Sequence, residues 1–141
     1  MQHKPSIVER VFDFNEQIVG VVVDELAPMP TAEAKWLASA FKEEGDELVD
    51  ASWGSDTGFE DDTVVDQVDA CLDTAIFAIG GLARIGLTRE QAEACFHAIM
   101  DANFEKKAGV KEGREGAKDA IKPEGWIGPE ARIKEILYGQ R

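Results

Sequence analysis

The chain has 141 residues, of which 44% are hydrophobic and 30% are charged, as in ordinary soluble globular proteins. This length favours one domain over residues 1–141 with a sizeable core, although it is short for an enzyme that acts as a monomer. The formal net charge of −13 argues against direct nucleic-acid binding, because no basic face is broad enough for a phosphodiester backbone. A small phosphorylated ligand would need bound cations to approach such a chain.

The N-terminal residues carry no apolar run of the kind that a signal peptide needs. No segment reaches eighteen uninterrupted apolar residues, so we expect no membrane span. The two cysteines, Cys71 and Cys95, lie among apolar residues, which is typical of reduced, buried thiols. We therefore expect the protein in the cytoplasm of its cell or host.

Capping residues, glycines and prolines divide the first half of the chain into helical segments. A first helix is expected over about 6–17, followed by an apolar run at 18–23 that fits either a helix or a strand. The proline-rich segment 26–30 interrupts regular structure. Thr31 is expected to cap a second helix, which ends within the glycine- and serine-containing segment 52–58.

The second half of the chain continues this helical pattern. A third helix is expected from Asp61 or Asp62 to about Arg84, because apolar residues recur there at spacings of three and four. A fourth helix should cover about 88–106, opening with a capping box. Residues 108–129 are rich in Gly and Lys and indicate a long mobile loop before a short helix at 130–138. Together these elements predict an all-α, four-helix-bundle-like fold with a long C-terminal loop and a short closing helix.

Two acidic sets lie on the second and third predicted helices: Glu43, Glu44 and Glu47, and then Asp66, Asp69 and Asp73. Within each set, spacings of three, four and seven residues place the carboxylates on one helix face. Asp69 and Asp73 lie in an apolar stretch, where a buried, unpaired charge needs a cation or a strong donor. Facing oxygen ligands without Cys or His favour Mg²⁺ or Mn²⁺, and hence a metal site that handles phosphates. In so acidic a chain, such a pattern is also typical of a solvated helix face.

The order of these motifs resembles that of a known family. Residues 42–48 (KEEGDEL) and 68–76 (VDACLDTAI) are similar to the all-α nucleoside triphosphate pyrophosphohydrolases of the MazG type, in particular to the phosphoribosyl-ATP pyrophosphohydrolase-like subgroup of phages and bacteria. Further similar motifs follow the family order over roughly Val11 to Leu137: 13–15 (DFN), 80–81 (GG), 85–87 (IGL), 103–106 (NFEK) and 122–126 (KPEGW). In one respect the chain departs from the broader pattern. The glutamate of the family's ExxD element would fall on Ala70, so Asp69 must substitute from the neighbouring position.

The resemblance implies hydrolysis of a nucleoside triphosphate between its α- and β-phosphates, with release of a monophosphate and pyrophosphate. It implies two or three Mg²⁺ or Mn²⁺ ions per site that neutralise the triphosphate and assist attack by water, with Glu43 or Glu44 as the general base. The implied catalytic residues are Glu43, Glu44, Glu47 and Asp73, and the implied metal ligands are these four and Asp69, with Asp66 as a possible ligand farther out. The implied substrate contacts are Asn15, Trp36, Lys42, Asn103, Lys106, Lys122 and Trp126. Trp36 or Trp126 would stack on the base, although tryptophan in a small bundle is often core filler.

Three functions stay open from the sequence. The first is a (deoxy)nucleoside triphosphate pyrophosphohydrolase of a nucleotide pathway in phage or bacteria, with purine substrates such as dGTP as one possibility. The second is the phosphoribosyl-ATP pyrophosphohydrolase of histidine biosynthesis, against which the long N-terminal arm and the Lys- and Gly-rich tail argue. The third is a non-catalytic acidic helical protein that binds cations or a partner. Apolar residues on more than one side of the third helix, and the resemblance, predict a homodimer or homotetramer.

Overall fold

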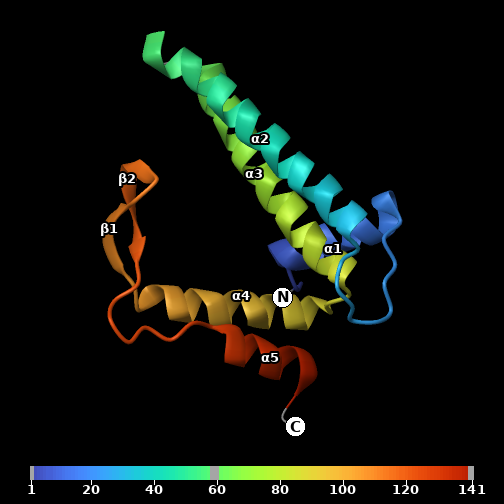
Figure 1. Cartoon of the computed structure of the whole chain (residues 1–141). Helices are drawn as coiled ribbons and strands as arrows, with labels where there is room; N and C mark the ends of the chain where they lie inside the picture. The colour runs from blue at the N-terminus through green and yellow to red at the C-terminus, as the bar shows by residue number, and fades with distance from the viewer. Residues whose placement is uncertain (1, 58–60, 140–141) are drawn as a thin grey trace. The chain divides into compact units, whose positions relative to one another are not determined.

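The computed structural model describes residues 2–57 and 61–139 (Figure 1). The chain forms two compact units, Met1–Arg89 and Glu90–Arg141, and each is considered by itself. In chain order the elements are α1 (Ile7–Phe14), the π-helical turn η1 (Asn15–Val19), α2 (Thr31–Thr57), α3 (Asp61–Ile85), α4 (Arg89–Phe104), β1 (Lys107–Lys111), β2 (Arg114–Ile121) and α5 (Glu130–Tyr138). The prediction of one domain over the whole chain is not tested by this division and stays a prediction.

The N-terminal helix α1 begins with a capping box. The Ser6 hydroxyl accepts a hydrogen bond from the Glu9 amide at 3.1 Å, and the Glu9 carboxylate accepts one from the Ser6 amide at 2.6 Å. The helix widens into η1, which ends at Gly20 with a positive φ of 80°. The first predicted helix is therefore confirmed in outline, and the ambiguous apolar run divides between the end of η1 and a segment without regular structure.

Two long helices, α2 and α3, pack side by side and dominate the first unit (Figure 1). The side of α2 that faces inward carries Leu37, Ala40 and Glu44, which are all buried and follow one another at helical spacing. Leu37 packs over Gly81 of α3, where a Cβ atom would come within 2.8 Å of the leucine side chain. Both helices were predicted from the sequence, and Gly58 of the expected connection lies outside the described residues.

The second unit corrects the predicted fold class. Residues 107–121, expected to belong mostly to a long loop, form an antiparallel hairpin in which Lys107 pairs with Ile121 and Lys111 with Arg114. Its two-residue turn places Gly113 at a φ of 84°, which a hairpin of this kind favours. Gly109 leaves the space that the Ile121 side chain occupies. The prediction of an all-α four-helix bundle with a long C-terminal loop is therefore wrong, because the glycines of this segment serve strand pairing and the turn.

The helices that flank the hairpin agree with the sequence. The predicted fourth and closing helices are confirmed as α4 and α5. Within residues 2–57 and 61–139, no helix is both long enough and apolar enough to span a membrane. Many large apolar side chains of α2 and α3 are exposed, among them Trp53, Val65 and Leu72. The helix pair therefore presents apolar surface to its surroundings.

Candidate functional site

Glu44 is the most unusual polar residue of the first unit. It lies in the middle of α2 on the face that packs against α3, and only 8% of its surface is exposed. Among the described residues, its Oε2 atom is the one buried side-chain oxygen or nitrogen without a hydrogen-bond partner. A buried carboxylate without a donor is costly. Stability therefore does not explain a glutamate at this position.

Three further carboxylates surround Glu44. Burial raises the pKa of Glu44, and the negative charges of Glu47 and Asp73 raise it further, with a smaller contribution from Glu43. Glu43 and Glu47 come from α2 and are exposed, whereas Asp73 comes from α3 and is half-buried. We call Glu43, Glu44, Glu47 and Asp73 the acidic cluster. The other three predicted catalytic residues therefore lie near enough to Glu44 to raise its pKa, and their catalytic role stays a prediction.

The side chains of the acidic cluster are not arranged as a metal-coordination site in this structure. Within the part of the chain that the structure describes, no three His, Cys, Asp or Glu side chains are arranged to hold a metal ion. Asp69 and Asp66 are exposed on α3, and neither contributes to the raised pKa of Glu44. The expectation that Asp69 is partly buried is wrong for this chain: Asp69 lies one helical turn before Asp73 on the same side of α3, but it is exposed, whereas its neighbour Ala70 is buried. The exposed side chains of Glu43 and Glu47 would have to turn toward an ion.

Two predicted substrate residues of the first unit are held by local contacts. Asn15 is buried, and its Nδ2 donates a hydrogen bond to the Val11 carbonyl at 2.9 Å. It lies against Gly80 of α3, where any Cβ would clash with the amide group. Lys42 is exposed and forms an ion pair with Asp46 at 2.7 Å, which raises the pKa of the lysine. These contacts give Asn15 a packing role and leave Lys42 beside the acidic cluster in sequence.

Trp36 lies in a cluster of side chains from α2 and α3. The guanidinium of Arg84 lies over the indole ring, 4.5 Å from its centroid, and Phe77 meets the ring edge-on at a centroid distance of 6.2 Å. Arg84 is fixed in turn by an ion pair with Glu33 at 2.6 Å. Sequence reasoning missed Glu33 and Arg84. The available signal was a single arginine at the end of the most apolar helix.

In the second unit, the structure brings together three predicted substrate residues. Lys106 and Lys122 place their ammonium groups 4.8 and 4.9 Å from the centroid of the Trp126 ring. The Trp126 Nε1 donates a hydrogen bond to the Ala102 carbonyl at 2.8 Å. We call Lys106, Lys122 and Trp126 the lysine–tryptophan cluster. Asn103 adjoins this cluster, since the backbone carbonyl of Asn103 accepts a hydrogen bond from the backbone amide of Lys106 at 3.0 Å.

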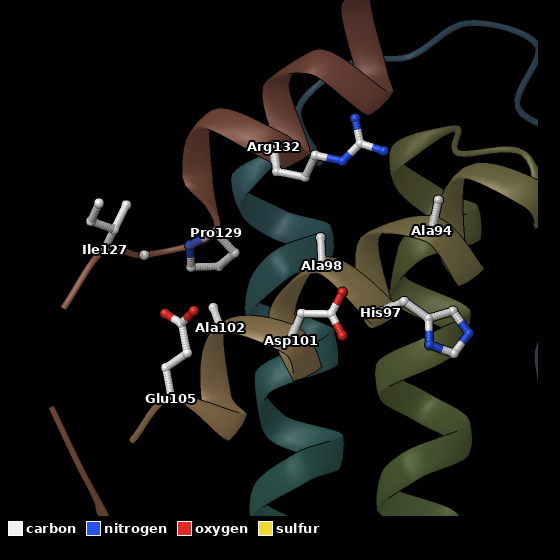
Figure 2. Close-up of a pocket in the computed structure, with 10 residues that line it drawn as sticks. Ala94, His97, Ala98, Asp101, Ala102, Glu105, Ile127, Pro129 and Arg132 are labelled. Carbon is white, nitrogen blue, oxygen red and sulfur yellow. The ribbon is translucent and has the colours of Figure 1, made fainter. Parts of the chain in front are cut away.

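The second unit also contains an open cavity of about 560 Å³ between α4 and the start of α5 (Figure 2). Ala94, Ala98 and Ala102 line it along α4, and Asp101, Glu105 and Arg132 are its charged lining residues. Arg132 is also paired with Glu135 at 2.8 Å. None of the residues predicted from the sequence as catalytic, metal-binding or substrate-binding lines this cavity. The candidate functional residues that the structure brings together therefore lie in two clusters, the acidic cluster in the first unit and the lysine–tryptophan cluster in the second.

Comparison with known proteins does not add to this picture. No protein-family model matches the sequence, and the search of curated proteins gave no match. The resemblance to MazG-type pyrophosphohydrolases therefore stays a prediction that rests on the motifs of this chain.

Proposed function

We propose that the chain is a metal-dependent pyrophosphohydrolase that converts a (deoxy)nucleoside triphosphate to the monophosphate and pyrophosphate. The observation that carries this proposal is the buried Glu44, which has three carboxylates around it and an oxygen without a hydrogen-bond partner among the described residues. Like charges collected on one side of a helix pair repel one another, and a buried member adds the cost of desolvation. A divalent cation would relieve both effects.

The donor set fits Mg²⁺ or Mn²⁺, because it consists of carboxylate oxygens without Cys or His. Glu44, Glu47 and Asp73 would hold the ions, with Glu43 and Asp69 as further ligands, and two or three ions suit this number of charges. When bound, such ions would neutralise the triphosphate and favour attack of water on the α-phosphorus. Without them, a chain with a net charge of −13 would repel its own substrate.

The residues of the acidic cluster differ in exposure, which suggests separate roles. Glu44 is buried and directed at α3, so it serves best as a ligand. Glu43 is its exposed neighbour, and we assign to it the general base that takes a proton from the attacking water. Lys42, Lys106 and Lys122 are the proposed donors to the phosphate oxygens, because ammonium groups form strong, charge-assisted hydrogen bonds with them. The side-chain amide of Asn103 is a further, uncharged donor in this proposal. Asn15 is the proposed contact to the sugar or the base.

The direct test is a pyrophosphate-release assay across the common NTPs and dNTPs, dGTP included, with Mg²⁺ or Mn²⁺. Phosphoribosyl-ATP belongs in the same panel, and activity confined to it would replace the proposed substrate by that of the histidine-pathway enzyme. Asp50→Asn is the matched control for Glu44→Ala, because Asp50 is an exposed acid on the same helix outside the acidic cluster. We expect activity in the parent and in the control, and its loss in Glu44→Ala. An inactive parent protein would contradict the proposal.

The exposed apolar residues of α2 and α3 support a second proposal, which concerns assembly. Val65 and Leu72 of α3 are 62% and 58% exposed, and Trp53 of α2 is 67% exposed. Apolar surface of this kind is usually covered by another chain. We propose a homodimer or homotetramer. Sedimentation should give a mass above the 15.4 kDa of one chain, and Leu72→Asp should lower it. An oligomer without any hydrolytic activity would favour the non-catalytic partner-binding function instead.

A further inference from the structure

We infer that Trp36 is the platform on which the nucleobase of the substrate stacks, and that Arg84, fixed by Glu33, is the residue that positions it. This inference rests on the proposed function, because it assigns the base to one end of the helix pair whose middle carries the acidic cluster. The sequence left open whether Trp36 or Trp126 stacks on the base. The contacts that the two indole rings make favour Trp36 over Trp126.

The Trp36 ring is held in place and still accessible. Arg84 covers the ring at 4.5 Å from its centroid, and 84% of the arginine side chain is shielded from solvent. The Glu33 carboxylate accepts a hydrogen bond from the guanidinium at 2.6 Å, so Arg84 has little freedom to leave the ring. Even so, 47% of Trp36 is exposed. A ring that is fixed and half-exposed suits stacking with a planar base, which contributes about 1–3 kcal/mol.

Helix geometry places Trp36 at a suitable distance from the acidic cluster. Trp36, Glu43 and Glu47 share one side of α2, since they follow one another at i, i+7 and i+11. At a rise of 1.5 Å per residue, seven to eleven residues correspond to roughly 10–17 Å along the helix axis. On α3, Asp73, Phe77 and Arg84 share a side in the same manner. Trp36, with Phe77 and Arg84 against its ring, and the acidic cluster therefore lie along one side of the helix pair. Their separation is comparable to that between the base and the phosphate chain of an extended nucleotide.

The other two tryptophans suit this role less well. Trp126 already has two ammonium groups on its ring, and its Nε1 is bonded to the Ala102 carbonyl. Trp53 is 67% exposed near the far end of α2, seventeen residues beyond Trp36. No ring or cation contact was found for Trp53 among the described residues, so its ring is not fixed in the manner of Trp36. Trp53 is therefore a suitable control.

Binding is tested first, by tryptophan fluorescence with a non-hydrolysable α,β-methylene nucleoside triphosphate and Mg²⁺. We expect the analogue to quench the fluorescence of the parent protein, and this quenching to be lost in Trp36→Phe and kept in Trp53→Phe and Trp126→Phe. Inorganic tripolyphosphate, which has no base, should not quench Trp36. Quenching that survives in Trp36→Phe, or that tripolyphosphate reproduces, would overturn the inference. Shielding of Trp36 from acrylamide in the parent protein would also overturn it, since Trp36 would then be covered by a second copy.

Kinetics separate positioning from a merely structural role. Trp36→Ala should raise KM by roughly 5- to 150-fold, the equivalent of the stacking energy, with a smaller change in kcat. Arg84→Met should raise KM in the same direction and Arg84→Lys should restore part of the loss, while Trp53→Ala leaves KM unchanged. Equal KM values for the Trp36 and Trp53 variants in an active enzyme would refute the role of Trp36 as base platform and would leave the proposed function intact. Quenching through Trp36 in a protein that hydrolyses no triphosphate would instead refute the proposed function and keep the base platform.

Discussion

The acidic cluster of the first unit and the lysine–tryptophan cluster of the second unit differ in how their charges are satisfied. In the acidic cluster, four carboxylates share one region, and a buried oxygen of Glu44 has no hydrogen-bond partner among the described residues. In the lysine–tryptophan cluster, two ammonium groups lie on the ring of Trp126, and its N–H is hydrogen-bonded. The first arrangement weakens the fold as it stands, whereas the second strengthens it.

This difference separates the groups that lower stability from the groups that raise it. Groups that lower stability and lie together on packed elements are the ones to test for chemistry. Lys106 and Lys122 already stabilise the second unit through their contacts with the Trp126 ring, so the proposed contact with phosphate would be a second role for them. Activity should therefore depend most strongly on the acidic cluster, and stability should respond in opposite directions in the two clusters.

The largest effect is expected from the acidic cluster. Replacing Glu44 or Asp73 by Ala should lower kcat for pyrophosphate release by roughly 10²–10⁴-fold, the range typical of acid–base groups and ligands that act on the reacting atoms. In metal-free buffer at neutral pH, Glu44→Gln should unfold at a higher temperature than the parent, because a buried negative charge is removed. Thermal melts followed by circular dichroism measure this change. Lower stability together with unchanged kcat would show that Glu44 is a structural residue.

Cation binding and pH should change stability through the same glutamate. The ordinary pKa of Glu44 is 4.5 and the folded value is higher, so the folded state keeps a proton that the unfolded chain has lost. The free energy of unfolding should therefore fall as pH rises through the interval between these two values. Asp119 acts with the opposite sign. The backbone N–H of Ala120, and then nearby cations, lower its pKa below 3.8, so its contribution is lost as pH falls through that region.

Addition of Mg²⁺ or Mn²⁺ should restore the free energy of unfolding that the charged Glu44 costs at neutral pH. A cation at 100 times its Kd stabilises the folded state by about 2.7 kcal/mol. This gain should be seen in the parent protein and in Asp50→Asn, and it should be much smaller in Glu44→Gln. Urea unfolding with and without metal measures it. An equal gain in all three proteins would place cation binding outside the acidic cluster.

Two glycines provide a comparison of backbone strain between the units. Gly86 has a φ of 92°, and a Cβ there would come within 2.3 Å of the Glu25 carbonyl oxygen. Gly113 has a φ of 84°, but a Cβ there would meet no atom within 4 Å. Gly113→Ala should cost about 1–2 kcal/mol for the left-handed backbone alone. Gly86→Ala should cost about 1–3 kcal/mol more, because backbone must move. Similar losses in both variants would show that the loop before α2 adapts easily.

The sequence predicted the helices well and the second unit less well. Helices α2 and α3 have long apolar periodicity, and helical spacing predicted that Glu44 and Glu47 share a side of α2. The effect of Asp73 on Glu44 depends on the packing of α3 against α2. The hairpin was missed because Gly109, Gly113 and Gly116 were read as signals of a loop, whereas strand pairing and the turn at Gly113 decide the structure. Burial of Asp69 was wrongly predicted from apolar neighbours in sequence, since a helix carries neighbours on different sides. The contact between Glu33 and Arg84 spans 51 residues and depends on how α2 packs on α3.

The smallest effects are expected in the lysine–tryptophan cluster. Lys122→Met removes one cation from the Trp126 ring and should lower the free energy of unfolding by about 0.5–1 kcal/mol. Lys118→Met is the matched control, because Lys118 is exposed on β2 nearby. If Lys122 also contacts phosphate, KM for the triphosphate should rise in Lys122→Met while the control keeps the parental value. A change in stability without any change in KM would limit Lys122 to holding Trp126, and phosphate binding would then have to come from the acidic cluster and its cations.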